Sequence, residues 1–146
     1  MPSFTLVTDN LKTLLQDDAG ILSFCNDTWG RVITVKKVFK PRTEIKNNEF
    51  PIIMVTRPKA KKNLLTPGVK DGDHTVLLFC GIYSEDREKA QDYLVAMEEL
   101  IEDAIVGDYT LGGTVTSAIP TDTANDEGHY HPVYFLVVAV EIKHRR

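Results

Sequence analysis

Apolar residues recur at every third or fourth position near the N-terminus, a spacing that indicates one face of an amphipathic helix. The face consists of Phe4, Val7, Leu11, Leu14 and Leu15. This pattern predicts a helix over about 4–17. The stretch that follows, through Trp29 and Gly30, has no clear period, and we expect it to be irregular.

A second stripe with the same spacing predicts a longer helix over about 84–106. Ser84 can supply the oxygen of an N-cap, and Gly107 stands where helices commonly end. The apolar stripe consists of Ala90, Leu94, Met97, Ile101 and either Ala104 or Ile105. The outer face carries four acids without a basic residue nearby, namely Glu98, Glu99, Glu102 and Asp103.

Segments rich in β-branched and aromatic residues indicate strands. They are 32–39, 52–55, 74–83, 114–119 and 133–142. The unbroken apolar run 52–55 is typical of a strand covered on both sides, and Pro51 fits at its start because it lacks an amide donor. A polar loop, 121–131, is expected between the last two strands.

Residues 57–73 lack a period and combine prolines and glycines with five basic side chains. This composition predicts a long loop or an extended basic arm. Its basic residues are Arg57, Lys59, Lys61, Lys62 and Lys70.

The order of elements is helix, two strands, arm, strand, helix and two strands. It predicts an α+β (two-layer α/β) fold with a mixed, mostly antiparallel sheet of four to five strands. The long helix is expected on one face of this sheet. A chain of 146 residues is long enough for one core, so we expect residues 1–146 to form a single domain.

The net charge of −4 conceals a strong asymmetry along the chain. Residues 31–70 hold 11 Lys and Arg against two acids, a net charge of +9. The remainder holds six basic residues against 19 acids, a net charge of −13. Such separation suggests either a surface that faces phosphates or two surfaces that attract each other between copies, whereas a single run such as 59–62 can also be a solvated loop.

Candidate chemistry is sparse. His129 and His131 stand beside Asp126 and Glu127, but no third ligand at a motif-like spacing can be named, so ordinary histidines are the better interpretation. The glycines do not reproduce a phosphate-binding motif. We therefore expect no catalytic residues, no cofactor, no metal and no enzymatic activity.

Cys25 and Cys80 lie in apolar surroundings without CxxC spacing, which favours reduced thiols. No segment approaches the roughly 18 apolar residues of a membrane span. The N-terminal sequence MPSFTLVTDN has an acidic residue where a signal peptide carries basic ones. We expect synthesis in a reducing cytoplasm and no contact with a membrane.

The order of elements and several local motifs resemble the tail terminator (tail completion) proteins of long-tailed bacteriophages. The matching features lie within 47–143: the FP pair Phe50-Pro51, Ser84 before the long helix, a D-x-x-LGG turn at 108–113, and a long final strand at 133–142. Residues 1–45 match in outline. The basic arm is longer and more basic than the pattern requires.

The resemblance implies a ring, a hexamer in that family, that caps the tail tube, ends its growth and offers a docking surface to the head. It implies a place in the virion at the head-proximal end of the tail. The partners would be other copies of the chain, the tail tube protein and a head completion or connector protein. The basic arm (Arg57, Lys59, Lys61, Lys62, Lys70) would contact a neighbour or the lumen, and Glu98, Glu99, Glu102 and Asp103 would form the acidic partner face.

Other functions stay open at this point. A head-to-tail connector or stopper is also a small ring protein without catalytic chemistry. A sequence-independent DNA-binding module would use residues 31–70, and its affinity would fall steeply with salt. Non-specific contact of the arm with passing DNA is compatible with the ring. A metal hydrolase built on His129 and His131 is the remotest alternative.

Overall fold

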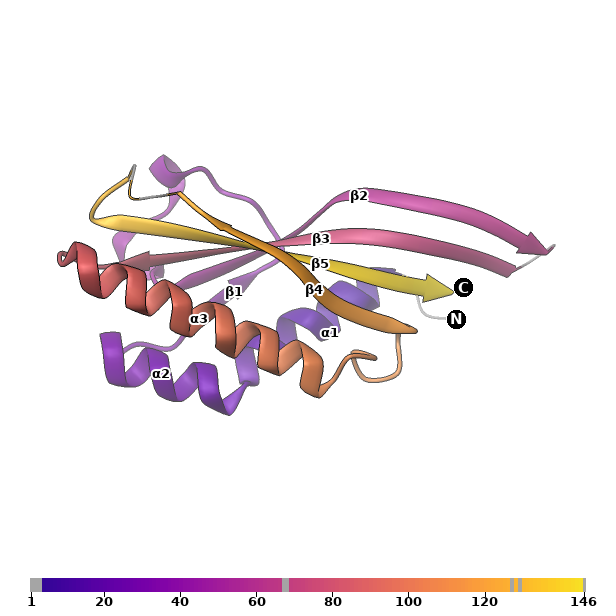
Figure 1. Ribbon diagram of the computed structural model, residues 1–146, viewed down its shortest axis with the longest axis horizontal. Helices are drawn as coiled ribbons and strands as arrows, with labels where there is room; N and C mark the ends of the chain where they lie inside the picture. Colours follow the sequence, from indigo (N-terminus) through magenta and orange to yellow (C-terminus); the bar gives the residue numbers. More distant parts are fainter. Residues whose placement is uncertain (1–3, 67–68, 127, 129, 146) are drawn as a thin grey trace.

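A computed structural model describes residues 4–66, 69–126, 128 and 130–145, with side chains described outside 59–71 and 145. Figure 1 shows the elements in chain order. They are α1 (Phe4–Asp17), α2 (Ala19–Trp29), β1 (Thr34–Lys36), the 3-10 turns η1 (Arg42–Glu44) and η2 (Asn47–Glu49), β2 (Ile52–Thr66), β3 (Val69–Tyr83), α3 (Arg87–Gly107), β4 (Ser117–Asn125) and β5 (Val133–Arg145).

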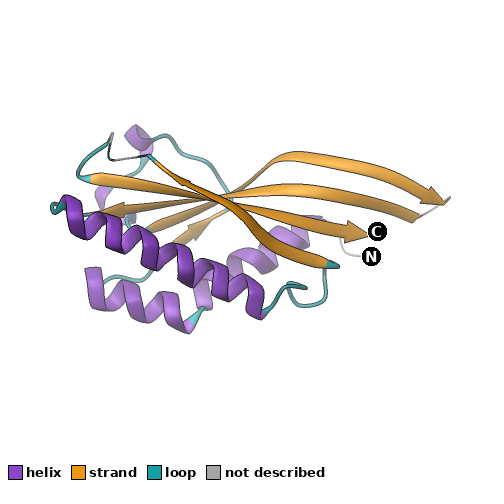
Figure 2. Ribbon diagram, in the orientation of Figure 1, coloured by secondary structure: helices purple, strands orange, loops and turns teal. Residues whose placement is uncertain are grey.

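The strands of the described chain form one five-stranded sheet in the order β1-β2-β3-β5-β4. β1 runs parallel to β2, and every other neighbouring pair is antiparallel. The three helices lie together on one face of the sheet (Figure 2). The predicted α+β fold with a mixed, mostly antiparallel sheet is confirmed.

The main core lies between the sheet and the helices. α1 contributes Val7, Leu11 and Leu15, all fully buried, as its spacing predicts. Alternate residues of β3 and β5 face the same core, because successive side chains of a strand point to opposite sides. The predicted stripe of α3 is buried there, and it consists of Ala90, Leu94, Met97, Ile101, Ala104 and Ile105.

A smaller cluster lies on the opposite face of the sheet. Its buried members are Ile45, Phe50, Ile52, Met54 and Val133. Since Ile45 and Phe50 precede β2, the segment 37–50 folds back over this face. The rest of the face is covered only in part, with Phe79, Tyr83 and Phe135 partly buried.

The long helix begins later than predicted, at Arg87 rather than at residue 84. Asp86 is its N-cap, because the Asp86 carboxylate accepts the backbone N–H of Glu88 at 3.0 Å and of Lys89 at 3.1 Å. The Ser84 hydroxyl instead donates to the Asp86 carbonyl oxygen at 2.9 Å. Two potential capping residues stand close together, and the pattern of apolar residues does not distinguish them.

Replacing this cap provides a first prediction. Asp86→Ala is expected to lower the free energy of unfolding by about 1 kcal/mol, because two backbone N–H groups lose their acceptor. Asp86→Asn is the matched control and should stay near the wild type, since Asn caps as well as Asp. Urea unfolding measures both variants. Equal losses in the two would exclude capping as the role of this side chain.

The prediction of an irregular stretch after α1 is wrong, because residues 19–29 form α2. Asp18 caps this helix by accepting the Ile21 N–H at 3.0 Å. Gly30 ends it with a φ of 65°, a left-handed conformation that glycine adopts without strain. β1, in contrast, has three residues where eight were expected at 32–39.

Of the two alternatives for 57–73, the loop is wrong and the extended arm is the better description, because β2 and β3 continue as a paired hairpin up to Thr66 opposite Val69. Figure 1 shows this hairpin projecting well beyond the helices. β4 lies later than the predicted strand at 114–119 and extends into the predicted loop at 121–131. The long final strand is confirmed as β5.

The D-x-x-LGG turn connects α3 to β4. The Asp108 carboxylate oxygens each accept the Gly112 N–H at 3.2 Å. Leu111, Gly112 and Gly113 all have positive φ values, of 49°, 70° and 83°. Glycines at the last two positions let the backbone make this turn without steric strain.

Candidate functional site

The basic hairpin, defined as residues 57–73, is the first of two predicted surfaces. Its register places Lys59 opposite Thr75, Lys61 opposite Asp73 and Lys62 opposite Gly72, with Lys70 opposite Leu64. β1 pairs with β2 only as far as Met54, so beyond that residue β2 has a free edge within the described chain. The lysines therefore belong to a ribbon that is exposed as a strand edge.

Strand addition at this edge is discouraged. The pairing of β2 with β3 is irregular between Thr56 and Lys59, where Pro58 lacks an amide donor. Lysines, prolines and bulges are the features that keep sheet edges from pairing with other chains. β4, the opposite edge, has an irregularity beside Pro120 as well. Any chain that contacts either edge is therefore expected to do so through side chains.

Arg57 stands at the base of the basic hairpin and is tied to α1. Its guanidinium carbon lies 4.9 Å from the centre of the Phe4 ring. Its Nη1 is 3.2 Å from His74 Nδ1, and His74 stacks on Phe4 with ring centres 4.0 Å apart. This residue therefore fixes the hairpin to the body of the protein, a role that the charge pattern did not indicate.

The acidic surface, defined as Glu98, Glu99, Glu102 and Asp103, lies on the outer side of α3 beside β4. Glu99 and Asp103 are exposed, whereas Glu98 and Glu102 are half-buried. Glu98 Oε1 accepts the Thr123 hydroxyl at 2.6 Å. None of the four acids forms an ion pair with a residue whose side chain is described.

A shallow groove of about 210 Å³ separates α3 from β4 beside these acids. Glu102 and Asp122 contribute carboxylates to its lining. Val106 and Ile119 also line it, and they are 62% and 54% exposed. The acidic surface thus combines charge with exposed apolar area, as a surface that another protein covers does.

The environment of Glu102 disfavours its charged form. Partial burial raises the pKa of Glu102, and the nearby charges of Glu98, Asp103 and Glu99 raise it further. A cationic partner would relieve this repulsion. The surface is therefore suited to lysine and arginine side chains from outside the chain.

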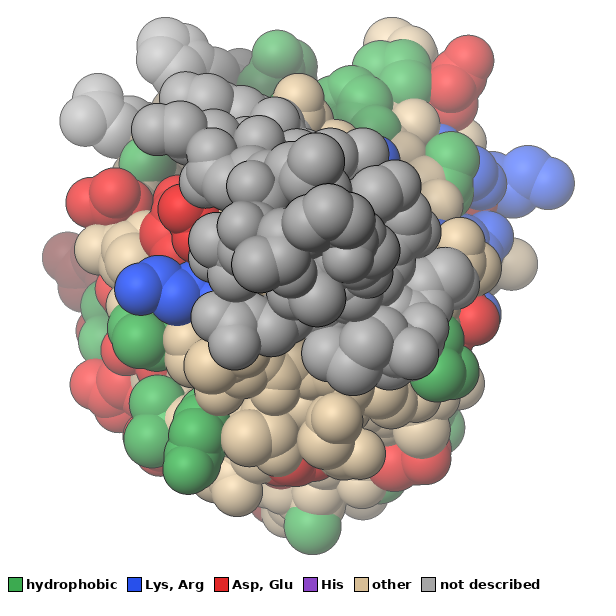
Figure 3. Space-filling model, turned by 90° about the vertical axis from the view of Figure 1, so that its right-hand side faces the viewer, with side chains coloured by type: hydrophobic (Ala, Val, Ile, Leu, Met, Phe, Trp, Pro, Cys, Tyr) green, Lys and Arg blue, Asp and Glu red, His purple; other side chains and the backbone are tan. Residues whose placement is uncertain are grey.

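The acidic side chains are concentrated on the side of the molecule where α3 and β4 lie. Figure 3 views the end from which the basic hairpin projects, and Asp and Glu side chains predominate at the left of this view, where α3 and β4 lie. Lys and Arg side chains gather at the right edge, with acidic side chains above and below them.

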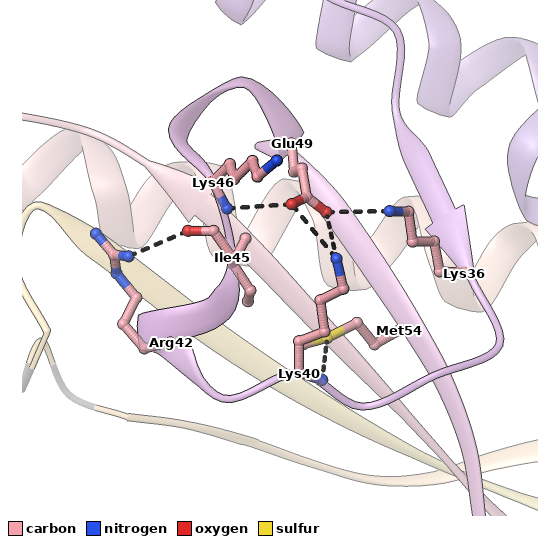
Figure 4. A network of polar contacts seen from close by, with 7 residues as sticks. All are labelled: Lys36, Lys40, Arg42, Ile45, Lys46, Glu49 and Met54. Carbon is pink, nitrogen blue, oxygen red and sulfur yellow. Dashed lines mark hydrogen bonds and ion pairs between the residues drawn. The ribbon is translucent and has the colours of Figure 1, made fainter.

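An ion-pair network anchors the segment 37–50 over the sheet (Figure 4). Glu49 Oε2 lies 3.2 Å from both Lys36 Nζ and Lys40 Nζ. Glu49 Oε1 accepts the Lys46 backbone N–H at 3.1 Å. The Lys46 N–H, followed by the Lys36 and Lys40 ammonium groups, lowers the pKa of Glu49 to about 2, although burial opposes the shift.

This network predicts a pH dependence. A carboxyl whose folded pKa is depressed contributes stability above its unfolded pKa of about 4.3, and this contribution is lost as the pH falls toward 2. Glu49→Gln is expected to lose about 1 kcal/mol at pH 7, the scale of a partly exposed ion pair. The difference from the wild type should disappear near pH 2 in urea unfolding. A difference that is constant over this range would contradict the role of the charge.

Other candidate groups offer little chemistry. Cys25 and Cys80 are free and buried, and burial raises the pKa of both, that of Cys25 to about 12. Such thiols are poor nucleophiles.

The histidines considered as metal ligands form no site within the described part of the chain. His129 lies outside the described residues, and His131 Nδ1 contacts the Tyr134 hydroxyl at 2.5 Å. No group of three or more potential metal ligands occurs among the described residues, and none of their helices could span a membrane.

Comparisons with known proteins bear on the fold. No protein-family model and no curated protein sequence matches the chain. Among solved structures, the chain is similar to one from the virion of a native gene transfer agent (GTA) particle, with a TM-score of 0.58. The two are 9% identical, and the match covers 93% of this chain and 92% of that one. The similarity spans almost the whole of both chains and shows a shared fold.

Proposed function

We propose that this protein is a phage-like structural virion protein that caps the tail tube as a ring, ends its polymerisation and offers a docking surface to the head connector. The role is structural rather than enzymatic. The separation of the basic hairpin from the acidic surface supports it most directly. A virion chain with the same fold supports the coarser assignment to virion structural proteins.

A ring requires two unlike surfaces on each subunit, because its contacts are head-to-tail. The basic hairpin and the acidic surface satisfy this requirement. The hairpin carries Lys59, Lys61, Lys62 and Lys70 on a projecting ribbon, and the acidic surface lies on α3. We propose that the hairpin of one copy lies against the acidic surface of the next.

Contact with DNA is the second use proposed for the basic hairpin. A cationic ribbon that faces the lumen of a ring would meet the phosphates of passing DNA without reading its sequence. The excess of acids outside residues 31–70 makes a free DNA-binding module the weaker proposal. Steeply salt-dependent binding of duplex DNA by single subunits would favour that module instead.

The test has two parts. The native mass of the purified protein, alone and mixed with tail tubes, should correspond to a closed ring, and a hexamer is the expected number. Tails assembled without the protein should be irregular in length when viewed by electron microscopy. Tails of normal length without it, but with heads unattached, would instead identify a connector or stopper. A solitary subunit under every condition would exclude all ring functions.

A further inference from the structure

A small aromatic pocket lies on the face of the sheet opposite the helices. It has a volume of about 250 Å³ and lies between the segment 39–42 and strands β3 and β5. Phe39 and Tyr130, both 53% exposed, stand at its rim. Phe79 and Phe135 lie behind them, with the Phe39 and Phe79 ring centres 5.0 Å apart and those of Tyr130 and Phe135 5.9 Å apart.

One carboxylate in the lining of the pocket has an oxygen without a hydrogen-bond donor among the described residues. Asp126 lines the pocket, and its Oδ1 accepts the Gly128 N–H at 3.1 Å. Its Oδ2 is buried and has no hydrogen-bond partner among the described residues. A buried carboxylate oxygen without a donor is costly, so a missing donor is the expected explanation.

The basic residues of the same pocket are engaged elsewhere. Lys40 Nζ pairs with Glu49 at 3.2 Å, as Figure 4 shows. Arg42 donates from Nη1 to the Ile45 carbonyl oxygen at 3.5 Å, and its guanidinium lies 5.5 Å from the centre of the Phe50 ring. Asp126 is therefore left for a cation from outside the chain.

We propose that this pocket receives an arginine side chain of another virion protein. Aromatic rings attract a cation over their faces, and a planar guanidinium both stacks on rings and donates to a carboxylate. A volume of about 250 Å³ lies below the 300–1,000 Å³ usual for small-molecule sites, so one side chain fits better than a cofactor. The partner thus anchors a single arginine between Phe39 and Tyr130.

The occupant is a different protein rather than a second copy. In the proposed ring, the basic hairpin of a neighbouring copy meets four carboxylates on α3, a stronger attraction than one carboxylate behind aromatic rings. The pocket lies instead on the face of the sheet that the helices leave uncovered. The identity of the occupant rests on the proposed function, whereas binding of arginine to the pocket can be measured in any oligomeric state.

The test uses N-acetyl-arginine methylamide as a probe, with the citrulline analogue as its neutral control. Titration of the full chain, followed through the NMR signals of the Phe39 and Tyr130 rings, should saturate with the arginine probe. The citrulline analogue should bind at least about tenfold more weakly, the usual effect of losing a charge-assisted hydrogen bond.

Asp126→Asn is the decisive variant. It keeps an oxygen for the Gly128 N–H and removes the charge, so it should lose the response to arginine without a lower melting temperature. Equal binding of both probes, or unchanged arginine binding in Asp126→Asn, would overturn the proposal. A lower melting temperature would show that the carboxylate serves the fold, which would overturn it as well.

Three further outcomes can be distinguished, the first with one additional variant. If Arg42 itself neutralises Asp126, wild-type protein will not respond to arginine but Arg42→Gln will, and the proposal fails. If Asp126→Asn lowers the native mass, the occupant is a second copy, and the assignment to another protein fails. If the native mass corresponds to a single subunit while arginine still binds, the ring proposal fails and the proposal for the pocket is retained.

Discussion

Reversing three charges of the basic hairpin, in Lys59→Glu/Lys61→Glu/Lys62→Glu, is expected to convert the native assembly into single subunits. In the proposed ring these residues face four carboxylates of the next copy, and like charges brought together across an interface cost several kcal/mol. The measurement is native mass at an ionic strength of about 0.15 M, where charges interact over roughly 8 Å. Wild-type protein should itself dissociate more readily in 1 M salt.

A compensating variant makes this prediction specific. Adding Glu99→Lys, Glu102→Lys and Asp103→Lys to the hairpin variant should restore the ring, because both surfaces change sign together. Glu98 is left unchanged since it accepts a hydrogen bond from Thr123. Lys89→Glu/Lys143→Glu is the control, because both lysines are exposed and lie outside the hairpin. A ring that survives the hairpin reversal would disprove the proposed contact.

The amphipathic helices were the most predictable part of the fold. In α1 and α3 the apolar spacing matches the helix period over three or more turns, so both were located to within three residues at each end. The fold class followed from the order of elements. The start of α3 was misplaced because Ser84 and Asp86 are both good capping residues.

Elements with few core contacts were the least predictable. In α2 only Ile21 and Cys25 are fully buried, and two positions are too few to establish a period. β4 is an edge strand whose last residues are exposed, so its polar sequence looks like a loop. The hairpin extends beyond the helices, where no core imposes an apolar pattern. Local sequence therefore gave no signal for strands in these places.

The features of the candidate site also differ in how well the sequence predicts them. The charge asymmetry along the chain indicated both surfaces, because the signs of side chains can be counted without a structure. The contact between Arg57 and Phe4 joins residues that are 53 positions apart in the sequence. A count of charges along the sequence cannot reveal such a contact. The aromatic pocket likewise combines residues from separate parts of the chain, namely Phe39, Phe79, Asp126, Tyr130 and Phe135.

Truncating the centre of the α3 stripe should have the largest effect on stability. Ile101 is fully buried between α3 and the sheet. Ile101→Ala is expected to lower the free energy of unfolding by about 2–5 kcal/mol, because it removes buried apolar contacts and leaves a cavity. Urea unfolding at neutral pH measures the loss. Because Glu98 and Glu102 flank Ile101 in the helix, the acidic surface depends on the same packing.

Val95→Ala is the control for this packing, since Val95 lies on α3 and is 51% exposed. Its cost is expected to stay below about 0.5 kcal/mol. Similar losses in the two variants would mean that α3 is not packed on the sheet through Ile101. If the helix holds the acidic surface in place, Ile101→Ala should also weaken the ring at temperatures below unfolding. Val95→Ala should leave the native mass unchanged, which separates support of the acidic surface from direct contact with the neighbour.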